Sequence, residues 1–302
     1  MTEKGRPMRV LLATDGSDDA KAAVAWLRAL PLPADREIMV ITVVNRMVVP
    51  LDPNLLGELD AALVVEARRL ADDTAAELLT GRSAIGRVAQ GDPREQIVRS
   101  AADWGADLIV MGARGLGAVR EFFLGSTSLG VARRAACPVL VCKGEPRDIH
   151  TITVALDGSA HARRALAWVA TLPLPQPTRV QLIAVAEPEH YPSSAPGILR
   201  ESLRTAVAAV EAERRAALEG ELASAAELLR GRVHLVERHV MTGAPAEAIV
   251  REAQRQGSDL IVVGARGLGA VTRLLLGSVS ESVLRHAGCL VLVVPSPTRE
   301  VR

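Results

Sequence analysis

The stretch "DLIVMGARGLGAVREFFLGSTS", residues 107–128, recurs in the chain as a near copy, "DLIVVGARGLGAVTRLLLGSVS", at residues 259–280. Each copy starts with an apolar, strand-like run that ends in glycine, passes through a loop with further glycines, and reaches a Gly-Ser pair that opens a helical pattern. The repetition predicts a duplicated domain and a site that both copies carry.

A second pair of matching segments fixes the organisation of the chain. Residues 10–33, "VLLATDGSDDAKAAVAWLRALPLP", align without gaps on residues 152–175, "ITVALDGSAHARRALAWVATLPLP". A period near ~145 residues is far longer than a solenoid repeat, so the sequence predicts two tandem domains, 1–145 and 146–302. The second copy also carries an insertion of about ten residues between its matching blocks, which includes the Pro/Ser-rich "EPEHYPSSAPG".

Strand and helix patterns alternate along each copy. The first copy contains the strand-like runs "RVLLAT", "EIMVITVV", "GRVAQG", "DLIVMG" and "PVLVCK", separated by segments with helical periodicity, and the second copy repeats this order. Continuous apolar strands that alternate with helices are typical of parallel sheets covered on both faces. The sequence therefore predicts an α/β protein of two tandem doubly wound domains, each a five-stranded parallel sheet with helices on both faces.

Composition disfavours several classes of partner. Lys plus Arg number 36 against 35 Asp plus Glu, a net charge of +1, and aromatic residues make up 2% of the 302 residues. The chain offers neither a basic field nor stacking platforms, so we expect no nucleic-acid partner and no membrane partner. The first residues lack an apolar signal core and no run approaches ~18 apolar residues, which favours a cytoplasmic protein.

The cysteines and histidines show no metal-ligand pattern. Cys137, Cys142 and Cys289 lack Cys-x-x-Cys spacing, and the histidines lack any comparable ligand spacing, so we expect a reducing compartment and no metal site built by the protein. Cys137 and Cys289 occupy matching positions before the last strand of each copy. Packing in the core is the expected role of both thiols, and redox sensing is the alternative.

The glycine-rich stretch has the chemistry of a phosphate loop. Open parallel sheets bind ligands at the carboxyl ends of their strands, where this loop begins. Gly112 ends the fourth strand and Gly115 follows it, so the backbone can come close to a ligand. Gly125 and Ser126 then begin a helix whose free N–H groups and dipole favour an anion. Four arginines could screen phosphate charge here: Arg114, Arg120, Arg266 and Arg273.

Two better-known phosphate loops fit less well. A Walker loop requires a lysine before its Ser or Thr, and none precedes Ser126 or Ser278. A dinucleotide fingerprint follows the first strand, whereas these glycines follow the fourth. Both copies match a different pattern, G-x2-G-x9-G-[ST], at four fixed positions each.

This pattern, with Asp15 at the end of the first strand, resembles the universal stress protein family in its tandem form, over roughly residues 8–143 and 149–295. The resemblance implies a five-stranded α/β sandwich of the adenine nucleotide alpha hydrolase type and, in the subclass with this glycine motif, bound ATP. It implies one ATP per domain, and any metal is expected to be Mg²⁺ or Mn²⁺ carried on the phosphates.

The resemblance also assigns nucleotide contacts by position. Asp15 and Asp157 would contact adenine or ribose, and Val43 and Val185, each 28 residues after its aspartate, would line the base pocket. The glycines would lie against ribose and phosphates. The candidate residues in the first copy are Ala13, Asp15, Val43, Met111, Gly112, Arg114, Gly115, Gly117, Gly125, Ser126 and Thr127. Those in the second are Ala155, Asp157, Val185, Val263, Gly264, Arg266, Gly267, Gly269, Gly277, Ser278 and Val279.

Alternatives stay open for the aspartates and for the function. Asp15 and Asp157 could cap the helix that follows, unless Ser17 or Ser159 does so. Neither copy shows a nucleophile elbow or a general base beside the phosphate loop, which favours a stress-response regulator that binds ATP and hydrolyses it slowly or not at all. An ATP-using enzyme of the adenine-nucleotide hydrolase type is one alternative, and a structural interaction module stabilised by nucleotide is another.

The last strand of each copy suggests how the two halves meet. The runs "PVLVCK" and "LVLVVP" are short and apolar, and the resemblance places them at a sheet edge, where unpaired backbone groups invite antiparallel pairing. We therefore expect an intrachain pseudo-dimer of the two domains. A homodimer of whole chains and an unidentified protein partner are further possibilities.

Overall fold

The structure is a computed structural model that describes residues 6–45, 52–78, 83–116, 124–188, 197–267 and 276–295. The first repeat consists of β1 (Met8–Ala13), α1 (Asp18–Ala29), β2 (Arg36–Val44), α2 (Pro53–Leu78), β3 (Ser83–Gln90), α3 (Pro93–Trp104), β4 (Leu108–Gly112), α4 (Ser126–Arg134) and β5 (Val139–Cys142). The second repeat has the same order: β6 (Thr151–Ala155), α5 (Ala160–Thr171), β7 (Arg179–Ala186), α6 (Gly197–Leu229), β8 (Leu235–Thr242), α7 (Pro245–Arg255), β9 (Leu260–Gly264), α8 (Ser278–His286) and β10 (Leu290–Val294).

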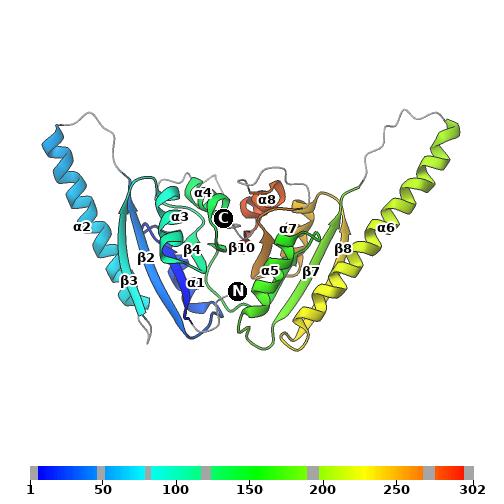
Figure 1. Cartoon of the computed structure of the whole chain (residues 1–302), viewed down its shortest axis with the longest axis horizontal. Helices are drawn as coiled ribbons and strands as arrows, with labels where there is room; N and C mark the ends of the chain where they lie inside the picture. The colour runs from blue at the N-terminus through cyan, green and yellow to red at the C-terminus, as the bar shows by residue number, and fades with distance from the viewer. Residues whose placement is uncertain are drawn as a thin grey trace, which may run out of the picture.

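The two repeats form one continuous sheet of ten strands, in the order β3-β2-β1-β4-β5-β10-β9-β6-β7-β8 (Figure 1). Within each repeat all neighbouring strands are parallel, which confirms the predicted five-stranded parallel sheets. At the centre, β5 and β10 pair antiparallel, with Val141 opposite Val291 and Val139 opposite Val293. The expected pairing of the last strands is therefore confirmed.

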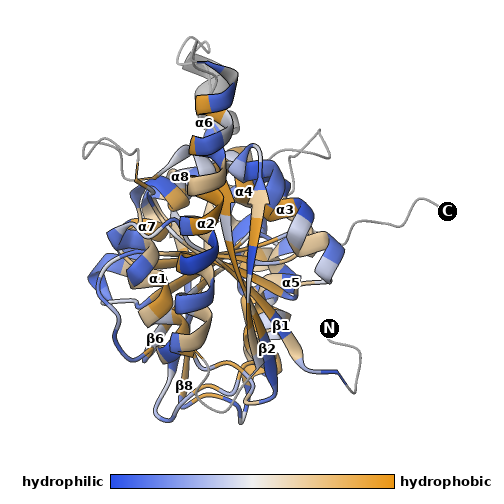
Figure 2. Ribbon diagram, turned by 90° about the vertical axis from the view of Figure 1, so that its left-hand side faces the viewer, coloured by the Kyte–Doolittle hydropathy of each residue, from blue (hydrophilic) through white to orange (hydrophobic). Residues whose placement is uncertain are grey.

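Helices cover both faces of this sheet, and each face has its own apolar layer. One layer packs beneath α1, α2, α5 and α6, and the other beneath α3, α4, α7 and α8. Figure 2 shows the hydrophobic strands as the middle layer, with hydrophilic residues on the helices. Both layers contain buried residues of both repeats, such as Leu140 and Leu292 in the first, so the halves share a core across the β5–β10 junction.

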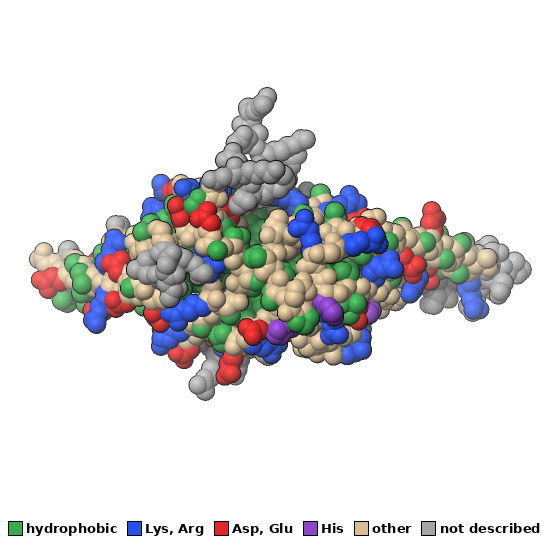
Figure 3. Space-filling view, turned by 90° about the horizontal axis from the view of Figure 1, so that it is seen from below, with side chains coloured by type: hydrophobic (Ala, Val, Ile, Leu, Met, Phe, Trp, Pro, Cys, Tyr) green, Lys and Arg blue, Asp and Glu red, His purple; other side chains and the backbone are tan. Residues whose placement is uncertain are grey.

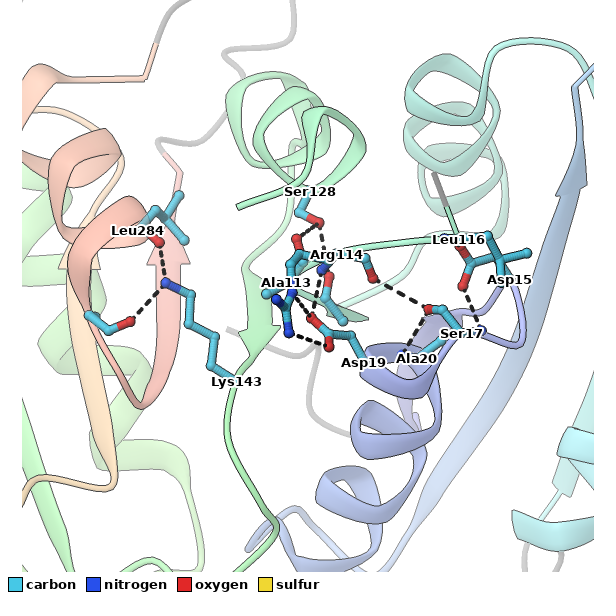
Figure 4. Close-up of polar contacts among 12 residues, drawn as sticks. Asp15, Ser17, Asp19, Ala20, Ala113, Arg114, Leu116, Ser128, Lys143 and Leu284 are labelled. Carbon is cyan, nitrogen blue, oxygen red and sulfur yellow. Dashed lines mark hydrogen bonds and ion pairs between the residues drawn. The ribbon is translucent and has the colours of Figure 1, made fainter. Parts of the chain in front are cut away.

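Polar contacts add to this junction. The Lys143 Nζ donates to the backbone carbonyls of Leu284 and Ala287 at the end of α8 (Figure 4). Arg133 on α4 forms an ion pair with Glu281 on α8 at 2.6 Å. Cations that hydrogen-bond the last carbonyls of a helix also interact favourably with its dipole. The two repeats are therefore joined by backbone, apolar and charged contacts.

The helices begin where the sequence provides caps. The Ser17 side chain accepts a hydrogen bond from the Ala20 amide at the start of α1, and Ser159 does the same for Ala162 at the start of α5. These serines, and not the preceding aspartates, are the N-caps, so the capping alternative for Asp15 is wrong. The aspartate carboxylates are left for other contacts.

The surface matches the balanced composition. Seen from below, the molecule shows cationic and anionic side chains interspersed, without a field of one sign (Figure 3). Helices α2 and α6 lie at the two outer ends of the sheet and project beyond it (Figure 1). Within the described part of the chain, no helix is both long and apolar enough to cross a bilayer.

Candidate functional site

The predicted site residues gather at the carboxyl ends of the strands, around one cavity in each repeat. In the second repeat a cavity of about 680 Å³ is lined by every described candidate: Ala155, Asp157, Val185, Val263, Gly264, Arg266, Gly267, Gly277, Ser278 and Val279. In the first repeat a cavity of about 110 Å³ is lined by Ala13, Asp15, Val43, Met111, Gly112, Arg114, Gly115 and Thr127.

A few candidates lie elsewhere. Gly125 and Ser126 begin α4 next to the first cavity but are not part of its wall. Gly117 and Gly269 lie outside the described residues, as do Arg120 and Arg273. The second cavity extends further than the sequence indicated, because Arg214, Ala217, Leu218 and Glu221 of α6 also line it.

The first glycine of each motif is explained by packing inside the protein. A Cβ atom on Gly112 would lie 2.6 Å from the carbonyl carbon and oxygen of Asp19, at the start of α1. A Cβ on Gly264 would lie 2.8 Å from the backbone nitrogen of Ala162, at the start of α5. Among the described motif glycines none has a positive φ, so close approach and not backbone conformation requires glycine here.

The second glycine of each motif lies against the aspartate that follows the first strand. A Cβ on Gly115 would lie 2.4 Å from the Asp15 Oδ2, and one on Gly267 would lie 2.6 Å from the Asp157 Oδ2. In the first repeat this Oδ2 accepts the backbone N–H of Leu116 at 2.9 Å (Figure 4). The other oxygen, Oδ1, accepts the backbone N–H of Ser17 at 3.1 Å. Asp15 thus joins the turn after β1 to the glycine loop after β4.

Arg114 has a defined partner in the first repeat. Its Nε and Nη2 each donate to the Asp19 carboxylate at 3.0 Å, and its backbone N–H donates to the same carboxylate at 3.0 Å (Figure 4). This hydrogen bond and the opposite charge of Asp19 raise the pKa of Arg114 above its usual value. The guanidinium that the sequence assigned to screening phosphate is already paired with a carboxylate of α1.

The second repeat differs at this position. His161 stands where the first repeat has Asp19, because both residues follow the cap serine of the first helix by two positions. Burial lowers the pKa of His161, and the positive charges of Arg266 and Arg164 lower it further, although Asp157 opposes them. The imidazole is therefore mainly uncharged at neutral pH.

The helix that closes each site offers free backbone donors. Gly125 and Gly277 are the N-caps of α4 and α8, and no side chain of the described residues caps either helix. Instead, the amides of Gly125 and Gly277 donate to the carbonyls of Ala113 and Ala265 at 2.8 Å, which folds the loop against the helix start. Uncapped first-turn N–H groups and the helix dipole make such an end favourable for an anion.

Two buried serines hold this helix start in place, and the sequence reasoning missed them. The Ser128 Oγ donates to the carbonyls of Gly112 and Ala113 at 2.9 Å, and the Ser280 Oγ donates to the carbonyl of Gly264 at 2.6 Å. Both are the last residue of the duplicated "STS" and "SVS". The sequence signal that could have identified them is their recurrence, because each follows the motif serine of its repeat by two positions.

The described thiols fit the packing role. Burial raises the pKa of Cys137 to about 12 and that of Cys289 to about 11. Both side chains pack against the apolar layer beneath α3, α4, α7 and α8. A thiol with a raised pKa stays protonated and is a poor nucleophile at neutral pH.

Fold and site together define a class: doubly wound α/β proteins with a glycine loop at the carboxyl edge of the sheet, here present twice in one chain. The model of the universal stress protein family matches residues 7–143 and again residues 148–295. The chain therefore belongs to the universal stress protein family, in the tandem two-domain form.

Individual relatives agree with this assignment. A universal stress protein of Thermus aquaticus is 40% identical over 141 residues, which are 44% of this chain and 97% of that relative. One of Mycobacterium tuberculosis is 28% identical over 323 aligned positions, which cover 97% of this chain and 99% of the relative. The crystal structure of a universal stress protein from Archaeoglobus fulgidus shares the fold, with a TM-score of 0.66, 24% identity and 98% coverage of both chains.

Proposed function

We propose that this chain binds ATP at the carboxyl edge of each repeat and acts as a nucleotide-dependent stress-response regulator. The observation that carries this proposal is the uncapped start of α8, which lines the 680 Å³ cavity together with the glycine loop after β9. An uncapped helix start is a favourable position for phosphate, and the cavity lies within the size range of sites for small molecules. The family resemblance of the glycine motif supplies adenine nucleotide as the ligand.

The residues present fit the group that the proposal requires. Ser278 would face the phosphates from the first turn of α8, Asp157 would face the ribose or the base, and Val185 and Ile249 offer an apolar wall for adenine. Any Mg²⁺ or Mn²⁺ would arrive on the phosphates, because the described residues contain no group of three or more metal-ligating side chains.

The same site supports binding better than turnover. Two of the carboxylates that line the second cavity are engaged: the Asp157 Oδ1 accepts the Ser159 amide at 2.9 Å, and Glu221 pairs with Arg163 at 2.8 Å. A group held in this way is a poor general base for an attacking water. Strong binding of the ground state without selective stabilisation of the transition state gives slow hydrolysis.

Mass spectrometry of the purified chain tests the proposal. Nucleotide that co-purifies with the protein is identified first, and its conversion is then followed over time with Mg²⁺ present. Retained ATP with negligible turnover supports a regulator. Turnover near ~10 s⁻¹, which is typical of a dedicated enzyme, favours the ATP-using enzyme instead. Regulation further requires a partner that reads the nucleotide-bound state, since a ligand shifts conformation only through differential affinity.

A further inference from the structure

Side chains of the first repeat hold α8, the helix whose start lines the cavity of the second repeat. Arg133 of α4 pairs with Glu281, in the first turn of α8, at 2.6 Å. Lys143, which follows β5, donates through its Nζ to the carbonyls of Leu284 and Ala287 at the other end of α8 (Figure 4). The first repeat therefore fixes both ends of this nine-residue helix.

Helix α4 of the first repeat cannot be held in the same way. Leu129 occupies the α4 position that aligns with Glu281, and its side chain is buried in the apolar layer. Pro295 aligns with Lys143. A leucine forms no ion pair, and a proline side chain has no hydrogen-bond donor. At these positions the support therefore runs in one direction, from the first repeat to the helix of the second.

The contact with Arg133 also sets the charge of the first turn of α8. Arg133 contacts the Glu281 Oε2 at 2.6 Å, and Arg285 of α8 contacts the Glu281 Oε1 at 2.8 Å. A lone carboxylate in this turn would repel a phosphate at the helix start. Two guanidinium charges against one carboxylate leave these three groups with one positive charge, and without Arg133 the remaining two are neutral. Arg133 therefore makes this turn electrostatically favourable for an anion.

Lys143 acts on the same helix from its carboxyl end. A cation there offsets the negative end of the helix dipole, so the helix start is more favourable for an anion. Burial lowers the pKa of Lys143 to about 8, so this positive charge is largely lost between pH 7 and 9. The groups that face Lys143 are Cys289, whose pKa burial raises to about 11, and the Arg114–Asp19 ion pair.

We propose that the first repeat positions the phosphate site of the second: Arg133 and Lys143 are positioning residues for an adenine nucleotide bound at the start of α8. This inference rests on the proposed function, because it concerns the same site. The second site is complete only while the β5–β10 junction holds α8, whereas the first site receives no such support from the aligned residues Leu129 and Pro295.

Photoaffinity labelling of the full chain with azido-ATP tests the inference, because peptide mass spectrometry reports the labelling of each repeat separately. Competition with unlabelled ATP then gives the ATP affinity of each site. The variants are Arg133→Ala and Lys143→Met. Arg134→Ala is the matched control, because it removes an exposed cation from the same last turn of α4. Lys21→Met controls for the loss of an exposed lysine, and thermal melting verifies folding.

Arg133→Ala and Lys143→Met are each expected to weaken ATP binding at the second repeat by about twofold to fivefold, the range for one charge at a helix end. The two controls leave that site unchanged, and Arg133→Lys restores the affinity. Arg133→Ala and Arg134→Ala affect the first repeat equally, because both remove a cation from the end of α4. Competition by uncharged adenosine is the same in all variants, since only the phosphate end is altered. From pH 7 to 9 the natural chain loses ATP affinity at the second repeat, and Lys143→Met does not.

Equal ATP affinities of the second repeat in Arg133→Ala and Arg134→Ala would overturn the inference while leaving nucleotide binding intact. A loss of ATP affinity matched by an equal loss of adenosine affinity would also overturn it, because that result indicates general damage to the site. Absence of any labelling that ATP can compete would instead remove the proposed function.

Discussion

The Asp15 Oδ2 lies 2.9 Å from the backbone nitrogen of Leu116, so a side chain from the turn after β1 accepts a hydrogen bond from the loop after β4. These two segments are about a hundred positions apart in the sequence. The contact needs Gly115 between them, because any Cβ there would lie 2.4 Å from the same oxygen. The glycine motif therefore builds a loop-to-loop contact as well as a surface for a ligand.

Replacement of Gly115 by alanine tests this contact. The new Cβ pushes the Asp15 carboxylate away from the Leu116 amide, so we expect the free energy of unfolding to fall by about 1–3 kcal/mol. ATP binding at the first repeat weakens, while the second repeat keeps its affinity. Urea denaturation and ATP titration measure the two effects. Gly288→Ala is the control, because a Cβ there has nothing within 4 Å. Equal stability of the two variants would contradict the steric account.

Replacement of Gly264 by alanine distinguishes a packing role of this glycine from a role in ligand binding. Its Cβ would meet the backbone of α5 at 2.8 Å, and backbone atoms cannot move aside as side chains can. We expect Gly264→Ala to lower the free energy of unfolding by about 1–3 kcal/mol even without nucleotide. Gly220→Ala, in the open middle of α6, is expected to raise it by about 0.5–1 kcal/mol. Chemical denaturation without nucleotide measures both free energies of unfolding. If Gly264→Ala is as stable as the natural chain, packing does not require this glycine and only its role toward a ligand remains.

The fold was predictable because its signals are local and duplicated. Each strand is a short apolar run, and each helix shows the helical periodicity of apolar residues. Because the second repeat has the same order of elements, each element could be predicted twice. The pairing of β5 with β10 was predictable because both runs are short and apolar and the family resemblance implied that they lie at a sheet edge. The differences between the sites were not predictable in this way. The partner of Arg114 is Asp19, 95 positions away. The alignment of residues 10–33 on 152–175 places His161 opposite Asp19, but it does not show that this position contacts the glycine loop.

The glycine motif was located correctly from the sequence, but its spacing did not show why glycine is required at each position. The spacing indicated a phosphate loop, yet Gly112 and Gly264 are required by the contact between a strand end and a helix start, whether or not a ligand binds. The buried Ser128 and Ser280 were missed for a related reason. Their hydroxyls donate to backbone carbonyls inside the protein. The recurrence of both serines marks the positions, but it does not show whether a serine is buried or exposed.

Lys143 predicts a pH dependence of stability. Burial lowers the pKa of this lysine from 10.5 to about 8 in the folded protein. Between these two values the unfolded chain keeps a proton that the folded chain has lost, so this group makes the free energy of unfolding rise with pH over that window. Lys143→Met removes this contribution. We expect the stability difference between the natural chain and the variant to shift in favour of the natural chain from pH 8 to 10.5.

Urea denaturation at several pH values measures this shift. Lys21→Met is the control, because the Lys21 side chain is 72% exposed on α1. The control is expected to show no such trend, because folding leaves the Lys21 side chain largely in contact with solvent. A pH-independent difference for Lys143→Met would show that its ammonium is not buried as the structure places it.

The β5–β10 junction predicts the behaviour of the separate repeats. The Thermus aquaticus relative, which aligns over 97% of its own length to 44% of this chain, has the size of a single repeat. A separate first repeat, residues 1–145, exposes the edge of β5 and the apolar layers beside it. We expect it to dimerise through this edge, with β5 pairing antiparallel with its copy. Sedimentation equilibrium measures this association, and a stable monomer at high protein concentration would contradict the arrangement.

Equilibrium titration of the full chain with labelled ATP measures whether the duplicated glycine loops bind adenine nucleotide. We expect saturable binding that approaches two ATP per chain. Absence of saturable binding at millimolar ATP would contradict this expectation.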